Sequence, residues 1–166
     1  MNVLITGITG LVGGGVLVRL LQSSRYKNIH VLIRGNDRKS AEERLQETLA
    51  ELLPPAALAS ASARVHAVSG DLRQPGLGLD AKARNTLIKD VQQIIHCSAC
   101  TKFDEDLEEL RLINREGSRQ LLDLARQAFY GGRFERFDLV STAYVAGEAS
   151  GVVSEDELQR GQSFSN

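Results

Sequence analysis

The chain has 166 residues, of which 42% are hydrophobic and 25% are charged, a composition typical of one globular domain with its own core. The formal charge of −1 gives no basic field for nucleic acid, and the apolar runs are too short to span a bilayer. Because the first apolar run begins almost at once, with no charged segment before it, we expect no signal peptide and a cytoplasmic location.

Short apolar runs of strand length alternate along the chain with segments whose apolar residues recur at helical spacing. The first half predicts, in order, a strand at 2–6, a helix over 11–23, a strand at 29–33, a helix from the candidate cap Ser40 to Pro54, and a strand at 65–68. The second half predicts a loop at 75–78, a short helix over 80–89, a strand at 91–97, a long helix over 106–130 and a strand at 137–140.

This alternation is typical of β-α-β units, which build a parallel sheet with helices on both faces. The predicted fold is therefore α/β, a Rossmann-type doubly wound parallel sheet with strand order 3-2-1-4-5. We expect residues 1–166 to form one domain whose sheet is incomplete on its C-terminal side.

The turn between the first strand and the first helix is rich in glycine. Gly7 allows a tight turn, Gly10 allows a pyrophosphate to approach the backbone, and Gly13 allows the helix to pack on the strand. A strand, a glycine turn and a helix N-terminus in this order predict a dinucleotide site, and a turn without a ligand is the alternative. The residues expected to contact the cofactor here are Gly7, Thr9, Gly10, Leu11, Val12 and Gly13.

The end of the second strand selects the cofactor in such folds, since an acid there binds the ribose of NAD and a basic residue accommodates the 2′-phosphate of NADP. Arg34 lies at this position and Arg38 follows it. A guanidinium group binds phosphate through two parallel hydrogen bonds, so we expect NADP(H). Asp37 leaves NAD(H) open as the weaker option, and an arginine that is simply exposed is the other alternative.

The ends of the later strands provide further candidate contacts, because ligands bind at the carboxyl ends of the strands in open α/β sheets. These candidates are Asp71, Leu72, Cys97, Ser98, Ala99 and Ser141. Thr142 follows the fifth strand, and its hydroxyl could hydrogen-bond a carbonyl that is being reduced. Cys97 and Cys100 have the C-x-x-C spacing of redox and zinc sites, but without the context of either, so we expect two reduced thiols.

The motifs together resemble those of an extended short-chain dehydrogenase/reductase, and more closely the thioester-reductase and fatty acyl reductase branch. The resemblance is carried by the glycine turn, residues 70–79, residues 114–118 and residues 141–147. It implies NADPH-dependent reduction of an acyl thioester, on coenzyme A or an acyl carrier protein, to an aldehyde or alcohol. It also implies that Thr142 takes the catalytic Ser/Thr position, and we expect Lys102 and Asn114 to contact the cofactor.

Two departures from that branch limit the expected activity. Cys97 and Ser98 replace Asn and Ala, and no tyrosine has a lysine four residues after it. The catalytic Tyr-x-x-x-Lys pair is thus missing, so we expect a piece of a longer enzyme that is inactive alone. A nucleotide-sugar epimerase or dehydratase and a non-catalytic NADP-binding module are the alternatives. The long helix over 106–130 could also serve as a homodimer face.

Overall fold

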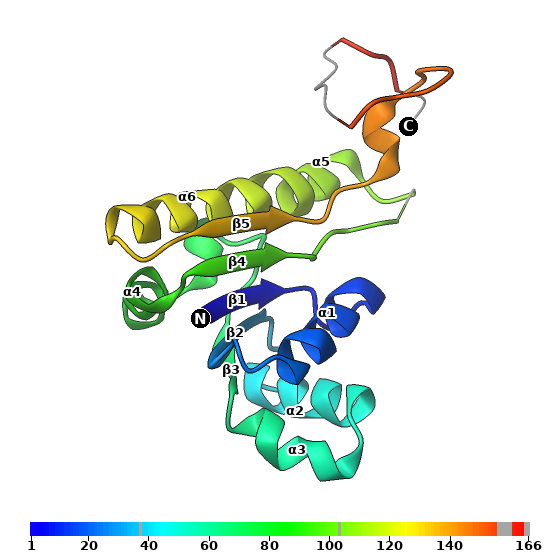
Figure 1. Cartoon of the computed structure of the whole chain (residues 1–166). Coiled ribbons are helices and arrows are strands. Elements are labelled where there is room, and N and C mark those ends of the chain that lie inside the picture. Colours follow the sequence, from blue (N-terminus) through cyan, green and yellow to red (C-terminus); the bar gives the residue numbers. More distant parts are fainter. Residues whose placement is uncertain (37, 103, 156–160, 165–166) are drawn as a thin grey trace.

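The computed structural model describes residues 1–36, 38–102, 104–155 and 161–164. Five parallel strands form one sheet in the order β3-β2-β1-β4-β5, which confirms the predicted order 3-2-1-4-5 (Figure 1). The strands are β1 Asn2–Thr6, β2 Asn28–Ile33, β3 Val65–Ser69, β4 Gln93–His96 and β5 Arg136–Leu139. Ile5 in the central strand lies opposite Val31 of β2 and Ile95 of β4.

Helices cover both faces of the sheet, as expected for a doubly wound fold (Figure 1). One face carries α1 Leu11–Gln22, α2 Ala41–Leu52 and α3 Pro55–Ser62. The other carries α4 Ala81–Asp90, α5 Leu107–Leu110, the π-helix η2 Arg111–Glu116 and α6 Gly117–Tyr130. Two short 3₁₀ turns complete the elements, η1 Pro75–Gly78 and η3 Ala143–Ala146.

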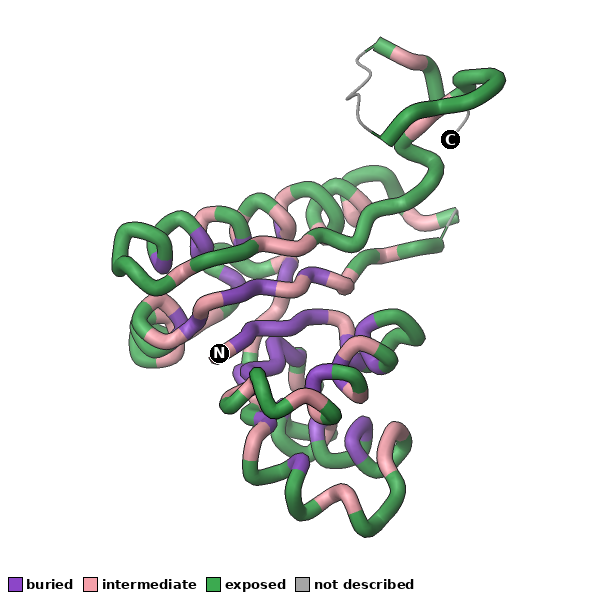
Figure 2. The backbone as a smooth tube through the Cα atoms, in the orientation of Figure 1, coloured by how far each residue is buried: buried purple, intermediate pink, exposed green. Residues whose placement is uncertain are grey.

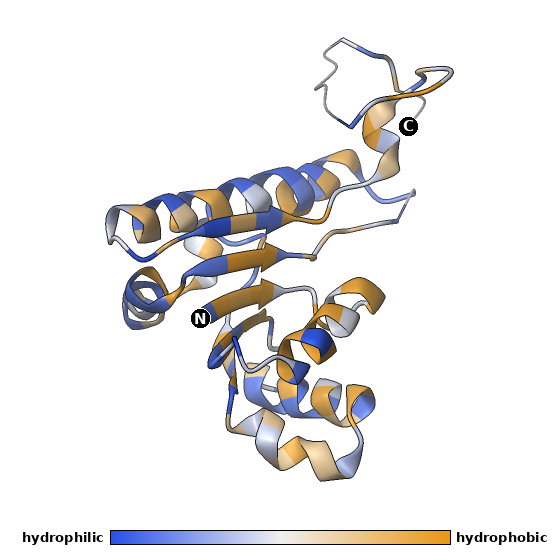
Figure 3. Ribbon diagram, in the orientation of Figure 1, coloured by the Kyte–Doolittle hydropathy of each residue, from blue (hydrophilic) through white to orange (hydrophobic). Residues whose placement is uncertain are grey.

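The hydrophobic core has two halves, one on each face of the sheet. Alternate residues of β1 point to opposite faces, so Val3 and Ile5 pack with α1 and α2, whereas Leu4 packs with α4 and α6. Burial is most complete in the inner strands β1, β2 and β4, whereas no residue of β5 is buried (Figure 2). The central strand β1 is apolar through most of its length, whereas β5 alternates polar and apolar residues, as suits its place at the edge (Figure 3).

Local sequence signals explain where several helices begin. Ser40 forms a capping box with Glu43, in which each side chain bonds the other's backbone amide, so the predicted cap is confirmed. Asp106 caps α5 through bonds to two backbone amides, so the helix begins at the end of the acidic run 104–106. The pair Pro54 and Pro55 ends α2 as predicted, but Pro55 also begins α3, which the sequence analysis did not anticipate.

None of the described helices has the length and apolar composition that crossing a bilayer would require.

Candidate functional site

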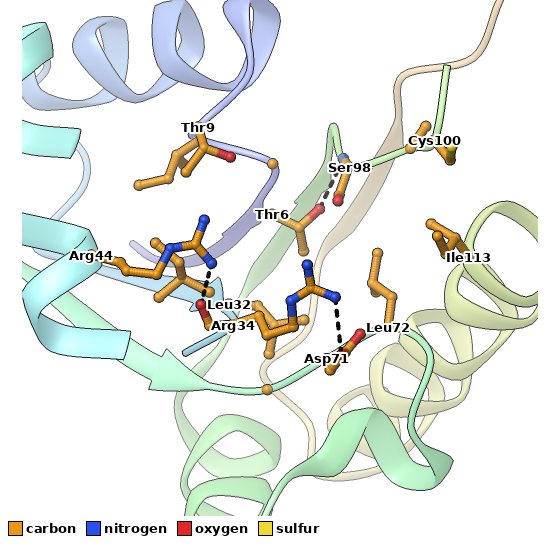
Figure 4. A pocket seen from close by; sticks show the side chains of 15 residues that line it. Thr6, Thr9, Leu32, Arg34, Arg44, Asp71, Leu72, Ser98, Cys100 and Ile113 are labelled. Atoms are coloured by element: carbon orange, nitrogen blue, oxygen red, sulfur yellow. Dashed lines mark hydrogen bonds and ion pairs between the residues drawn. The ribbon is translucent and has the colours of Figure 1, made fainter. Parts of the chain in front are cut away.

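A cavity opens at the carboxyl ends of β1 to β4, beside the point where the strand order reverses (Figure 4). β1 and β2 contribute their last residues and those that follow, and β3 and β4 contribute the residues that follow the strand. The lining consists of Thr6, Gly7, Ile8, Thr9, Leu32, Ile33, Arg34, Arg44, Gly70, Asp71, Leu72, Ser98, Ala99, Cys100 and Ile113. We call this cavity the cleft.

Glycine is required at two positions of the turn between β1 and α1. Gly7 has φ of +77°, and a Cβ atom there would lie 2.7 Å from the backbone of Cys97 and Ser98. A Cβ atom on Gly13 would lie 2.2 Å from the Gly7 carbonyl oxygen. The turn therefore packs backbone against backbone, both on α1 and on the segment after β4.

The N-terminus of α1 opens onto this turn. Gly10 caps the helix without a side-chain hydrogen bond, and the first turn of α1 holds no acidic residue. The first amide groups of a helix have no partner within it, and the helix dipole favours negative charge at this end. The turn thus offers backbone donors to an anion, with Leu11 94% exposed beside them.

Charged side chains line the opposite wall of the cleft. The Arg34 guanidinium lies 3.5 Å from an Asp71 carboxylate oxygen (Figure 4). Arg73, which is outside the lining, lies closer to the same carboxylate at 3.0 Å and also pairs with Glu109. Burial would raise the pKa of Asp71, but the hydrogen bonds from Arg73 and the charges of both arginines outweigh burial and lower it. Asp71 is therefore ionised near neutral pH.

Arg44 reaches the same wall from α2. Its guanidinium donates a hydrogen bond to the Arg34 carbonyl oxygen, and Figure 4 shows the two arginine side chains on one side of the cleft. The Arg34 side chain is 51% exposed and its contact with Asp71 is at the long limit of a hydrogen bond. Its guanidinium group is therefore accessible to a ligand.

The segment after β4 is held by side chains from two other elements. The Ser98 amide donates to Thr6 Oγ1 at 3.2 Å. Asn114 of the π-helix bonds both backbone groups of Cys100, accepting from its amide at 2.8 Å and donating to its carbonyl at 2.9 Å. Both cysteines are free, and burial raises the pKa of the Cys97 thiol. The C-x-x-C segment is thus a braced wall of the cleft.

The structure brings together many of the predicted contacts and leaves others apart. The predicted residues that line the cleft are Gly7, Thr9, Arg34, Asp71, Leu72, Ser98 and Ala99. Those that adjoin it on the glycine turn and α1 are Gly10, Leu11, Val12 and Gly13. The predicted residues outside the lining are Arg38, Cys97, Lys102, Asn114, Ser141 and Thr142. Asp37, on which the NAD(H) alternative depended, lies outside the described residues.

Two of the outlying residues make local contacts instead. Lys102 is exposed and pairs with Glu105 at 3.2 Å. Thr142 caps η3, because its hydroxyl oxygen accepts a hydrogen bond from the Tyr144 amide.

Eight residues of the lining were not predicted from the sequence: Thr6, Ile8, Leu32, Ile33, Arg44, Gly70, Cys100 and Ile113. Arg44 had a usable signal, since it lies one turn after the cap Ser40 in a helix that starts close to the carboxyl edge of the sheet.

Comparison with known proteins assigns the chain to a family. A family profile described as male sterility protein, of an NAD-binding type, matches residues 5–165. The chain belongs to the male sterility protein family. Its fold is thus that of an NAD(P)-binding Rossmann domain, and the resemblance to extended reductases of the fatty acyl and thioester branch is confirmed.

Individual relatives agree with this assignment. Fatty acyl-CoA reductase 1 of Xenopus laevis is 35% identical over 152 residues, which cover 86% of this chain and 28% of that protein. Human fatty acyl-CoA reductase 1 is 33% identical, with the same coverage. The chain thus spans under a third of the length of these curated relatives.

Solved structures show the same architecture. The terminal R domain from the myxalamid PKS-NRPS pathway has a TM-score of 0.78 and 29% identity, over 94% of this chain and 39% of that one. The reductase domain of a Mycobacterium tuberculosis non-ribosomal peptide synthetase has a TM-score of 0.69 and 29% identity, over 87% of this chain and 34% of that one. A Bacillus cereus UDP-glucuronic acid 4-epimerase solved with NAD shares the fold, with a TM-score of 0.65, at 24% identity over 94% of this chain and 44% of that one.

Proposed function

We propose that the chain binds NADP(H) in the cleft and forms the cofactor-binding part of a reductase of acyl thioesters. The observation that carries the cofactor choice is the accessible guanidinium of Arg34 where β2 ends, with Arg44 beside it. Two guanidinium groups provide planar donor pairs for a 2′-phosphate. The 2′-hydroxyl of NAD instead needs a hydrogen-bond acceptor, usually a carboxylate, at the end of β2.

The residues of the cleft fit the other parts of such a cofactor. The glycine turn and the open N-terminus of α1 would hold the pyrophosphate, since a Cβ atom would obstruct the turn at Gly7 and at Gly13. Asp71 and Leu72 would flank the adenosine half, and the Ser98 to Cys100 segment would form the wall between the two halves. When bound, NADPH supplies the hydride for a reduction.

The substrate class is inferred from the relatives, which are named as fatty acyl-CoA reductases and as reductase domains of peptide synthetases. We propose an acyl thioester, carried by coenzyme A or by a carrier protein. In this proposal the Thr142 hydroxyl would donate its hydrogen to the thioester carbonyl while its oxygen goes on accepting from the Tyr144 amide in the cap of η3. Because the chain has no Tyr-x-x-x-Lys, we expect it to bind the cofactor without turning it over.

Titration of the chain with NADPH and with NADH, followed by calorimetry or cofactor fluorescence, tests the cofactor choice. We expect NADPH to bind more tightly, and Arg34→Ala to weaken NADPH binding by about 10- to 100-fold, as expected for hydrogen bonds to a charged group. The affinity for NADH should change little, since NADH lacks the 2′-phosphate.

The matched control is Arg126→Ala, which removes an exposed arginine of α6 that does not line the cleft. Its NADPH affinity should equal that of the unchanged chain. Equal or tighter binding of NADH by the unchanged chain, or an equal loss in the Arg34 and Arg126 variants, would overturn the proposed choice of NADP(H).

A further inference from the structure

His96 is a buried polar residue that joins three elements around the cleft. It is the last residue of β4 and only 1% exposed. Its Nδ1 atom lies 2.7 Å from the Thr6 hydroxyl of β1, and its Nε2 atom lies 3.0 Å from the Ser118 hydroxyl of α6. Both ring nitrogens are therefore used in hydrogen bonds across the structure.

The direction of these hydrogen bonds follows from their outer partners. The Ser118 hydroxyl donates its only hydrogen to the Asn114 carbonyl oxygen at 2.6 Å, so it accepts from His96 Nε2–H. His96 Nδ1 then carries no hydrogen and accepts from the Thr6 hydroxyl, whose oxygen accepts from the Ser98 amide. The result is one continuous chain of hydrogen bonds from the amide of Ser98 to the carbonyl of Asn114.

Both ends of this series of hydrogen bonds lie at the wall of the cleft. The Ser98 amide belongs to the cleft lining, and the Asn114 side chain bonds both backbone groups of Cys100, two residues further on. Asn114 lies in the π-helix, an irregular helix type frequent at functional sites. The segment 98–100 is thus braced at both ends by groups that His96 connects.

We infer that His96 is a positioning residue, which sets the segment 98–100 and the π-helix against the glycine turn and so determines the affinity of the cleft for its cofactor. The inference rests on the proposed binding of NADP(H), because affinity is the quantity that the positioning serves. His96 does not line the cleft itself, so its effect passes through Thr6, Ser98 and Asn114.

The chain of bonds requires a neutral imidazole. Burial lowers the pKa of His96 to about 4, and among the described residues no charged side chain contributes to that shift. The groups that hydrogen-bond the ring are hydroxyls, Thr6 from β1 and Ser118 from α6. A proton on Nδ1 would leave the Thr6 hydroxyl without its acceptor, so the network is intact at neutral pH.

The test compares His96→Leu, Thr6→Val and the double variant for NADPH affinity. We expect about tenfold weaker NADPH binding in each single variant, as for the loss of a buried hydrogen bond. The double variant should show no further loss, because both substitutions interrupt the same series of hydrogen bonds. His96→Gln, whose amide retains a donor and an acceptor, should recover part of the affinity. Leu87→Ala, a buried residue of α4 outside the cleft, controls for a general loss of stability.

A second readout does not depend on the cofactor. Hydrogen exchange by NMR should show the amides of Ser98 and Cys100 exchanging faster in His96→Leu, with no comparable change in Leu87→Ala. If the unchanged chain binds neither NADPH nor NADH, the proposed function fails and the exchange rates alone decide about His96. Unchanged exchange at both amides, or NADPH binding by His96→Leu as tight as by Leu87→Ala, would overturn the inference. If His96→Leu does not fold, Ser118→Ala interrupts the same series of hydrogen bonds. The same changes in NADPH affinity and in amide exchange are then expected of Ser118→Ala, and their absence would overturn the inference.

Discussion

Two glycines in the same helix should respond to the same substitution in opposite directions. Gly13 and Gly15 both lie in α1, two residues apart, so alanine improves the intrinsic helix propensity equally at each. Their surroundings differ, since a Cβ atom at Gly13 would lie 2.2 Å from the Gly7 carbonyl oxygen, whereas one at Gly15 would meet nothing within 4 Å. We expect Gly15→Ala to stabilise the fold and Gly13→Ala to destabilise it.

The magnitudes follow from these distances. Gly15→Ala should raise the free energy of unfolding by about 0.5–1 kcal/mol, the usual difference between glycine and alanine in a helix interior. At Gly13 the obstructing atoms are backbone, which cannot rotate away as a side chain could. Overpacking of this kind costs about 1–3 kcal/mol, so the net effect after the propensity gain is a loss of up to about 2 kcal/mol.

Urea denaturation followed by far-UV circular dichroism measures both effects. A change of 1 kcal/mol corresponds to about 2–4 °C in melting temperature for a domain of this size, so a thermal scan gives an independent check. Gly13→Ala should also weaken cofactor binding, because it displaces the glycine turn, whereas Gly15→Ala should leave binding unchanged. If both substitutions stabilise the chain to the same extent, the close packing of α1 on the turn is refuted.

Two further predictions concern a helix cap and a charged group. Ser40→Ala should lower the free energy of unfolding by about 1 kcal/mol, because it removes the capping box with Glu43; a urea titration measures the loss, and no loss would contradict the cap. Asp71→Asn should be less stable than the unchanged chain at pH 7, because the carboxylate pairs with Arg73. Since folding lowers the pKa of Asp71, its contribution is present above the unfolded pKa of about 4 and disappears as the pH falls through the folded pKa. Urea titrations from pH 7 to pH 3 should therefore show the deficit of the variant shrinking, and a deficit that grows toward acid would contradict the ion pair.

Much of the fold is readable along the chain because its signals are local. Each strand is a short apolar run, and the cap at Ser40 is formed with a residue three positions away. The errors have local causes too. Pro54 and Pro55 stop one helix and start the next, and a sequence rule for helix ends does not distinguish a stop from a stop followed by a new start.

The candidate site is readable only in part. Gly7 and Arg34 were found because their positions relative to a strand end have a known meaning, and the strand order brings such ends together. Arg44 was missed because it reaches the cleft from a helix, where no strand end marks it. Lys102 lies outside the cleft lining and pairs with Glu105, so its contact with the cofactor stays a prediction.

The sequence by itself determined the strands, the glycine turn and the kind of ligand such a turn accommodates, because these depend on periodicity and on backbone freedom over a few residues. The strand order followed from their alternation with helices, because the crossovers of β-α-β units have a fixed hand. The tertiary structure decided which side chains share one cavity and how they bond. His96 shows the difference, since its partners Thr6 and Ser118 lie 90 and 22 residues away in the chain. Hydrogen bonds act over about 3 Å in space, and no separation along the sequence predicts which residues come within that distance until the strands and helices have packed.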